Sequence, residues 1–237
     1  MAKVVNTVMR NYRMLIIDES GSMGSVKDVT RDGINEQIQT IKKNAKKFKD
    51  QEYFTTVIFF NNDVRFAIFN ESTDALEELK VGDYNPDGST AMWDAIGEGV
   101  QRLKDDIVLE LKDPNTTVEI TVFTDGYENA SSKENKKIVP DLVKELQESK
   151  NSQWVFSIVG SKHTNVLDIA KELNIHSANT VAYDTSLIGT QSAFKGMAHA
   201  SVRYATRKSA GLHTNKAYFE DDDGLKDDFE KIEEEEK

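Results

Sequence analysis

The stretch that decides the fold is YRMLIIDESGS, residues 12–22. Its first seven residues form a short, mostly apolar run that ends in an acid, which is typical of a buried strand. A polar turn, DESGS, follows at 18–22, and apolar residues then recur at helical spacing over 24–48. A strand, a polar turn and a helix in this order predict the opening unit of an α/β sheet.

Segments of strand type and helix type alternate along the rest of the chain. We expect further strands at 53–60, 64–69, 117–124, 153–159 and 180–183, and further helices at 73–79, 91–111, 133–149, 166–173 and 186–204. A turn signal at 61–63 makes the strands on either side of it a hairpin. The alternation predicts an α/β fold of Rossmann-like type, with a doubly wound, mostly parallel sheet, one antiparallel edge strand and helices on both faces.

The composition excludes several classes of protein. The chain has 237 residues, 38% of them hydrophobic and 30% charged, which fits a globular protein rather than a disordered or fibrous one. No apolar run approaches the roughly 18 residues of a membrane-spanning helix, and the first residues do not resemble a secretory signal. The absence of cysteine excludes disulfides, thiolate zinc sites and a cysteine nucleophile. We therefore expect a cytoplasmic protein, and the net charge of −11 argues against a nucleic-acid partner.

The negative charge is concentrated at the carboxyl end. Residues 218–237 hold eleven Asp or Glu and three Lys. We expect one domain over 1–205 and an acidic, flexible tail over 206–237. The tail is either a solvated acidic segment or, since Leu225, Phe229 and Ile232 recur at helical spacing, a docking helix that orders on a partner. A lysine cluster within 42–49 could receive the tail, although an exposed lysine-rich helix face needs no partner.

Three polar loops carry the residues that suggest a site. They are 18–22, 88–90 and 125–126, and the first and third directly follow predicted strands. Because doubly wound sheets bind ligands beyond the carboxyl ends of their strands, we expect the three loops to meet at one edge. Carboxylates and hydroxyls without thiols or imidazoles suit a hard divalent cation, Mg²⁺ or Mn²⁺. If neutral hydroxyls supply most direct contacts, the cation keeps much of its charge and attracts an outside carboxylate.

These loops resemble the metal-ion-dependent adhesion site of von Willebrand factor A domains. The motif DESGS is followed by a threonine 72 residues after Asp18 and by an aspartate 107 residues after it. The resemblance covers roughly residues 10–205 and implies that Ser20, Ser22 and Thr90 touch the metal. It also implies that Asp18 and Asp125 hold the metal directly or through water. The missing signal peptide and missing cysteines are similar to the intracellular bacterial members of the family. Taken alone, DESGS is equally consistent with a polar turn in which Ser22 caps the following helix.

Three functions remain open at this point. The first is a non-enzymatic module that binds an Asp or Glu of a protein partner through Mg²⁺, as an intracellular adaptor or regulatory subunit. The second, implied by the resemblance, is a subunit of a bacterial stress-resistance system or of a system linked to an ATPase, kinase or phosphatase, such as tellurite-resistance and MoxR-type systems. The third is a Mg²⁺-dependent phosphohydrolase, since an Asp at a strand end also opens the haloacid dehalogenase site.

The phosphohydrolase is the weakest of the three hypotheses. Ser20 stands where that family has its general acid, and no glycine-rich phosphate loop with a lysine is present. The four histidines, at 163, 176, 199 and 213, show no ligand spacing. We therefore predict no catalytic residue and no enzyme, and we predict neither an oligomeric state nor a partner's identity.

Overall fold

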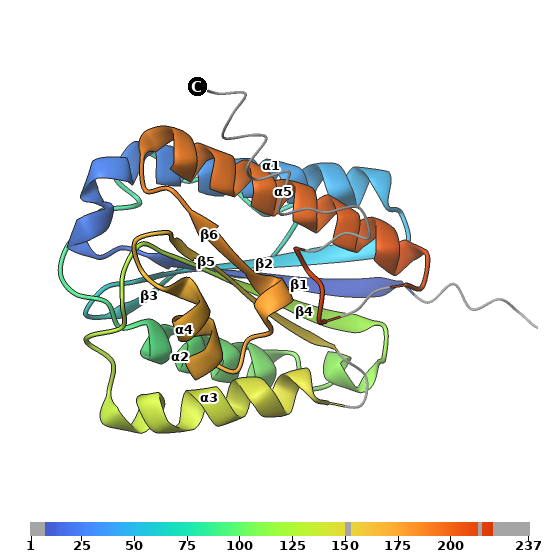
Figure 1. Cartoon of the computed structure of the whole chain (residues 1–237). Helices are drawn as coiled ribbons and strands as arrows, with labels where there is room; N and C mark the ends of the chain where they lie inside the picture. Colours follow the sequence, from blue (N-terminus) through green and yellow to red (C-terminus); the bar gives the residue numbers. More distant parts are fainter. Residues whose placement is uncertain (1–7, 150–152, 213–214, 220–237) are drawn as a thin grey trace, which may run out of the picture.

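The computed structural model describes residues 8–149, 153–212 and 215–219 and contains a six-stranded sheet (Figure 1). The strand order is β3-β2-β1-β4-β5-β6. The strands are β1 Met9–Asp18, β2 Gln51–Phe60, β3 Val64–Ser72, β4 Thr116–Thr124, β5 Trp154–Ser161 and β6 Thr180–Tyr183. β3 pairs antiparallel with β2 at one edge, and every other pairing is parallel. The predicted fold class is confirmed.

Helices cover both faces of the sheet. The α-helices are α1 Lys27–Lys47, α2 Met92–Asp106, α3 Lys133–Gln147, α4 Val166–Glu172 and α5 Leu187–Ser209, and three short 3₁₀ helices are η1 Gly21–Val26, η2 Glu110–Lys112 and η3 Ser177–Asn179. α1 and α5 lie side by side on one face, whereas α2, α3 and α4 cover the other (Figure 1). None of the helices in the described part of the chain is both long and apolar enough to cross a membrane.

The side chains of β1 show why this strand lies in the interior of the sheet. Leu15 and Ile17 pack into the core beneath α1 and α5, and Met14 and Ile16 pack into the core on the opposite face. Side chains alternate between the two faces of a strand, so an unbroken apolar run buries both faces only in the middle of a covered sheet. The apolar run in β1 therefore places this strand at the centre.

The segment 73–79 was predicted to be a helix, and this prediction is wrong. The chain makes a turn after β3 and then runs without regular structure, with Leu76 and Leu79 buried. Asn35 of α1 replaces the hydrogen bonds that a helix would have made, because its side-chain amide donates to Leu79 O (3.0 Å) and accepts from Leu79 N (2.8 Å). The helix predicted at 91–111 also ends earlier, at Asp106.

The packed domain continues beyond the expected boundary at residue 205. α5 runs to Ser209, and Tyr218 and Phe219 are buried in the same core as α1 and α5. The Tyr218 hydroxyl donates to Glu119 (3.2 Å), and its backbone N–H donates to the side chain of Asn179 (2.8 Å). The domain therefore includes Phe219, and the acidic residues predicted to form a tail, 220–237, lie outside the described residues.

A buried ionic cluster holds the end of α5 against the sheet. The Lys208 ammonium donates to Asn11 Oδ1 (2.7 Å) and Thr117 Oγ1 (2.5 Å), and Arg13 lies 3.6 Å from Glu119. Burial lowers the pKa of Lys208 to about 8, although the nearby Glu119 carboxylate opposes this shift. The cluster joins β1, β4 and α5, so it fixes the carboxyl-terminal half of α5.

Candidate metal centre

Two adjacent parallel strands bring the two aspartates of the predicted site to one edge. β1 and β4 pair in register up to Ile17 and Phe123, so Asp18 at the end of β1 and Asp125 just beyond β4 lie at the same edge. The loop 88–90 and the residue before it lie against the loop 18–22: Gly21 N donates to Gly88 O (3.1 Å), and Asp87 N donates to Glu19 O (2.8 Å). The structure thus brings together the three loops that the sequence indicated.

The hydroxyl groups of the site face one another. Ser20 Oγ and Ser22 Oγ lie 3.1 Å apart, and Ser22 Oγ donates to Asp125 Oδ1 over 2.7 Å. A Cβ built on Gly126 would lie 3.7 Å from Thr90 Oγ1, so the Thr90 hydroxyl faces the turn that follows β4. Ser20, Ser22 and Asp125 therefore form one chain of contacts, with Ser22 exposed and Ser20 buried, and Thr90 faces the residue that follows Asp125.

Asp18 forms the floor of this cluster. Its carboxylate is fully buried and accepts hydrogen bonds from Ser20 N (2.7 Å) and from Thr124 Oγ1 (2.5 Å). Burial raises the pKa of Asp18 to about 6 despite these hydrogen bonds, and burial also raises the pKa of Asp125. Within the described residues, neither aspartate forms an ion pair with a basic side chain. Both carboxylates therefore lack a positive counterpart.

This donor set fits a hard divalent cation. Two carboxylates and three hydroxyls offer only oxygen atoms as ligands. A cation would also supply the positive charge that balances the buried carboxylate of Asp18. No group of three or more His, Cys, Asp or Glu suited to a metal occurs in the described part of the chain. Any metal held at this edge of the sheet therefore depends on the serine and threonine hydroxyls.

Four residues that shape the site were not found from the sequence. Glu19 accepts two hydrogen bonds from Arg65 (2.7 and 2.9 Å), and the Tyr84 hydroxyl donates to Asp18 O (2.5 Å). Asn129 accepts from Thr90 N (2.9 Å) and donates its own N–H to Thr90 O (3.0 Å). These contacts hold the loops in place, and no local pattern around Arg65, Tyr84 or Asn129 marks them.

Glu128 and Thr124 also have defined roles. Glu128 accepts from Ser131 N (2.7 Å) and lies 3.4 Å from Lys136, so its carboxylate orders the turn before α3. Thr124 binds Asp18, and its position next to Asp125 at the end of β4 is the signal that could have identified it. Glu19 and Glu128 thus each have a basic partner, whereas Asp18 and Asp125 have none among the described residues.

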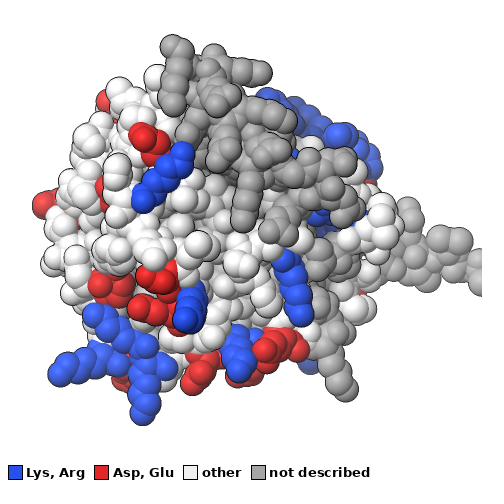
Figure 2. Space-filling model, viewed as in Figure 1, with Lys and Arg blue, Asp and Glu red and all other residues white. Residues whose placement is uncertain are grey.

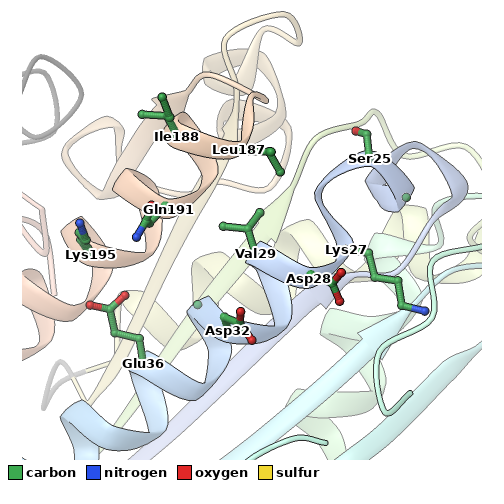
Figure 3. A pocket seen from close by; sticks show the side chains of 12 residues that line it. Ser25, Lys27, Asp28, Val29, Asp32, Glu36, Leu187, Ile188, Gln191 and Lys195 are labelled. Atoms are coloured by element: carbon green, nitrogen blue, oxygen red, sulfur yellow. The ribbon is translucent and has the colours of Figure 1, made fainter. Parts of the chain in front are cut away.

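A groove of about 840 Å³ begins beside the site. It is lined by Gly24 and Ser25 of η1, by α1 and by the first turns of α5. Figure 3 shows Val29, Leu187 and Ile188 around its apolar part and Asp28 and Asp32 along α1.

The fold has many counterparts among solved structures. No protein-family model matches the chain, and no curated protein matches it. A von Willebrand factor type A structure from Catenulispora acidiphila aligns with a TM-score of 0.55 and 14% identity over 82% of this chain and 43% of that one. The PilB minor pilin from Streptococcus sanguinis aligns with a TM-score of 0.54 and 12% identity over 82% of this chain and 62% of that one.

A third structure of this fold has an occupied metal site of its own. It is proximal thread matrix protein 1 from the mussel byssus with a zinc-occupied metal-ion-dependent adhesion site, with a TM-score of 0.55 and 12% identity over 84% of this chain and 47% of that one. This chain thus spans about half of the length of these structures. At such identities the likeness establishes the fold alone, which is that of a von Willebrand factor A domain.

Proposed function

We propose that this chain is a non-enzymatic, divalent-metal-dependent protein-binding module. In this proposal Asp18, Ser20, Ser22, Thr90 and Asp125 hold Mg²⁺ or Mn²⁺. The observation that carries the proposal is the convergence of three hydroxyls and two carboxylates that have no basic partner in the described structure. Bound Mg²⁺ would supply positive charge and an exchangeable coordination position, which suits a carboxylate from a partner.

The burial of the proposed ligands favours approach of a partner's carboxylate from one side of the site. Asp18 is fully buried and Ser20 nearly so, whereas Ser22 is exposed and Asp125 is half-buried. An Asp or Glu of a partner would therefore reach the site over Ser22 and Asp125. The residues beneath them keep the loops in position through Thr124 and Tyr84.

Two observations favour binding over catalysis. Both oxygens of the Asp18 carboxylate accept hydrogen bonds inside the protein, so Asp18 is poorly placed to attack a phosphoester. The hydrogen-bond partners of Asp18 and Asp125 are hydroxyls and backbone N–H groups, none of which is a general base near neutral pH. Turnover of p-nitrophenyl phosphate by the purified chain with Mg²⁺ would contradict the non-enzymatic assignment.

The proposal includes a cellular role for the module. A module of this kind serves as a bacterial, cytoplasmic adaptor, or as a regulatory subunit of a stress-resistance or ATPase-, kinase- or phosphatase-linked system. The zinc-occupied adhesion site of the mussel protein supports divalent-metal binding on this fold. Mg²⁺ or Mn²⁺ is the expected ion because the donors are all oxygen.

Metal binding can be tested directly by electron paramagnetic resonance of Mn²⁺ titrated into the protein. The wild-type chain should bind one Mn²⁺ that excess Mg²⁺ displaces, and Ser22→Ala should weaken binding at least tenfold. Ser25→Ala is the matched control, because Ser25 is an exposed serine of the same 3₁₀ helix outside the cluster. Equal Mn²⁺ affinity in the wild type and in Ser22→Ala would overturn the assignment of ligands.

Partner binding requires a second experiment. A random peptide library displayed on phage is selected on the wild-type protein in Mg²⁺ and eluted with EDTA. The eluted peptides should share an Asp or Glu, and their binding should be lost on Ser22→Ala but retained on Ser25→Ala. Peptides that bind equally with and without metal would count against the proposed function.

A further inference from the structure

The outer face of the α1–α5 layer is divided by charge along its length. The carboxylates of α1, at positions 28, 32 and 36, all lie in the first half of the helix. The second half of α1 and the two residues after it carry five lysines, Lys42, Lys43, Lys46, Lys47 and Lys49, and the first acid that follows them is Asp50. α5 contains no Asp or Glu, and Arg203 and Arg207 lie in its second half. One end of the layer is therefore strongly basic.

α1 and α5 run parallel, so their basic halves lie together. Gln37 donates to Phe194 O (2.7 Å) near the middle of the pair, and Gln51, just after α1, donates to Ala205 O (2.8 Å) near the end of α5. Figure 2 shows blue side chains gathered at the upper right, where α1 ends in Figure 1. We call the five lysines, with Arg203 and Arg207, the basic face.

The five lysines of the basic face have no acidic partner within the described residues. Other basic residues of the chain do, among them Arg10, Arg31, Arg65 and Lys136. Lysines at the end of a helix are favoured by its dipole, but like charges four residues apart repel one another. Pairs such as Lys42–Lys46 and Lys43–Lys47 therefore favour an anionic partner.

The chain itself supplies such a partner. Residues 220–237, which we call the acidic segment, contain eleven Asp or Glu and three Lys, a net charge of −8. The described chain ends at Phe219 beside the second half of α5, because the Tyr218 ring lies 5.5 Å from that of Tyr204 and Arg207 of the basic face donates to Ala217 O (3.3 Å). The acidic segment therefore begins next to the charges that complement it.

Length permits the contact. Eighteen residues span up to about 60 Å when extended. α1 is only about 30 Å long at 1.5 Å per residue, so the acidic segment can reach every lysine of the basic face. A tether of this length also gives a high effective concentration, so weak ionic contacts suffice.

We propose that the acidic segment 220–237 docks on the basic face formed by the second halves of α1 and α5 in the same molecule. The groove between the first halves of these helices is a poorer site for this segment, because the three carboxylates in its lining, Asp28, Asp32 and Glu36, outnumber its two lysines, Lys27 and Lys195. This proposal does not depend on metal binding. It assigns an occupant to a surface at the opposite end of α1 from the candidate metal centre.

The test uses the full chain and the absence of native cysteine. A nitroxide is attached through Glu234→Cys, and paramagnetic broadening of backbone amide resonances is measured in ¹⁵N-labelled protein. We expect the strongest broadening at 42–49 and 203–207. It should fall to background when salt rises from about 0.05 M to about 1 M, where the Debye length is about 3 Å.

Matched charge variants make the result specific. Lys43→Glu, Lys46→Glu and Lys47→Glu together should abolish the localised broadening. The same change at the exposed Lys133, Lys137 and Lys144 of α3, on the opposite face, should leave it intact. Adding Glu233→Lys, Glu235→Lys and Glu236→Lys to the first variant should restore the broadening, because the charges are then exchanged rather than removed.

Five outcomes would overturn the proposal. Uniform broadening, or localised broadening that survives high salt, would show that ionic docking does not occur. Broadening centred on 18–22, 88–90 and 125 in Mg²⁺ would show that the acidic segment supplies a carboxylate to the candidate metal centre instead. Broadening at 42–49 that appears equally when spin-labelled ¹⁴N protein is mixed with unlabelled ¹⁵N protein would place the segment on a second copy. Broadening centred on the groove residues 28–36 and 187–191 would place it at the other end of the layer.

Discussion

Ser22 and Asp125, which are 103 positions apart in the chain, are joined by a hydrogen bond of 2.7 Å from the serine hydroxyl to Asp125 Oδ1. The bond links the turn after β1 to the turn after β4 and lies at the exposed side of the candidate metal centre. Both groups offer oxygen atoms as metal ligands, and neither has a basic neighbour among the described residues. A cation bound here would therefore change this hydrogen bond directly.

Removing the Ser22 hydroxyl should remove stabilisation by metal. At a Mg²⁺ concentration 100 times its dissociation constant, the wild-type chain should gain about 2.7 kcal/mol, or roughly 5–10 °C in Tm. Ser22→Ala should show no more than about half of this gain, because a dissociation constant raised at least tenfold leaves at most about 1.4 kcal/mol. Thermal melts with Mg²⁺ and with EDTA measure the difference, and an unchanged Mg²⁺ response would contradict the expectation.

Asp18→Asn should have opposite effects with and without metal. An asparagine at this position can accept from Ser20 N and donate to Thr124 Oγ1, so both hydrogen bonds survive while the buried charge disappears. In EDTA at pH 7 the variant should be more stable than the wild type by up to about 3 kcal/mol, the linkage value for a pKa raised from 3.8 to about 6.

The gain in stability from Asp18→Asn should depend on pH. A carboxyl whose pKa is raised on folding costs stability once it ionises, so the advantage of Asp18→Asn should be complete above about pH 6 and vanish below about pH 4. With saturating Mg²⁺ the order should reverse, because the variant loses a charged ligand. Urea titrations at several pH values measure this, and an advantage that persists at low pH would refute the explanation.

Gly33→Ala should destabilise the domain although it occurs within a helix. A Cβ at Gly33 would lie 2.3 Å from two atoms of the Phe194 ring, which itself packs on Phe123. The overlap should cost roughly 2 kcal/mol, more than the gain of up to about 1 kcal/mol in helix propensity. Gly24→Ala is the control because a Cβ there meets nothing within 4 Å. Equal stability of the two variants would refute the close packing of α1 on α5.

Lys208 should make the domain more stable as the solution becomes mildly alkaline. Its pKa is lowered from 10.5 to about 8, so between these values the unfolded chain binds more protons than the folded one. The free energy of unfolding should therefore rise by roughly 2 kcal/mol from pH 8 to pH 9.5 relative to Lys208→Met. Urea titrations of both proteins at these two pH values test this. An equal change in the free energy of unfolding of the two proteins would show that folding does not lower the pKa of Lys208.

Tyr218 should behave as a core residue although it lies beyond α5. It is nearly fully buried and donates to the buried Glu119. Tyr218→Ala should lower the free energy of unfolding by about 3 kcal/mol. Leu212→Ala, at an exposed leucine between α5 and this segment, should change it by less than about 0.5 kcal/mol. A small effect at Tyr218 would mean that the domain ends with α5.

The local pattern of the sequence was sufficient for the class of fold. The apolar run before Asp18 and the alternation of strand and helix segments predict the sheet, because periodicity is a property of neighbouring residues. Strand ends in a doubly wound sheet lead to one edge, which predicts that the loops with Ser20, Ser22 and Asp125 lie close together. The resemblance to von Willebrand factor A domains added Thr90, and the role of these residues as metal ligands stays a prediction. The structure brings these residues together.

Only the tertiary structure decided the features that depend on contacts between distant residues. Segment 73–79 is irregular because Asn35 satisfies the backbone of Leu79, and Glu19 is neutralised because β3 presents Arg65 to it. Tyr218 belongs to the core because Glu119 and Asn179 lie beneath it. None of these contacts can be predicted from periodicity or from a local motif. The two residues of each contact are distant in sequence and meet only because the folded chain packs them together.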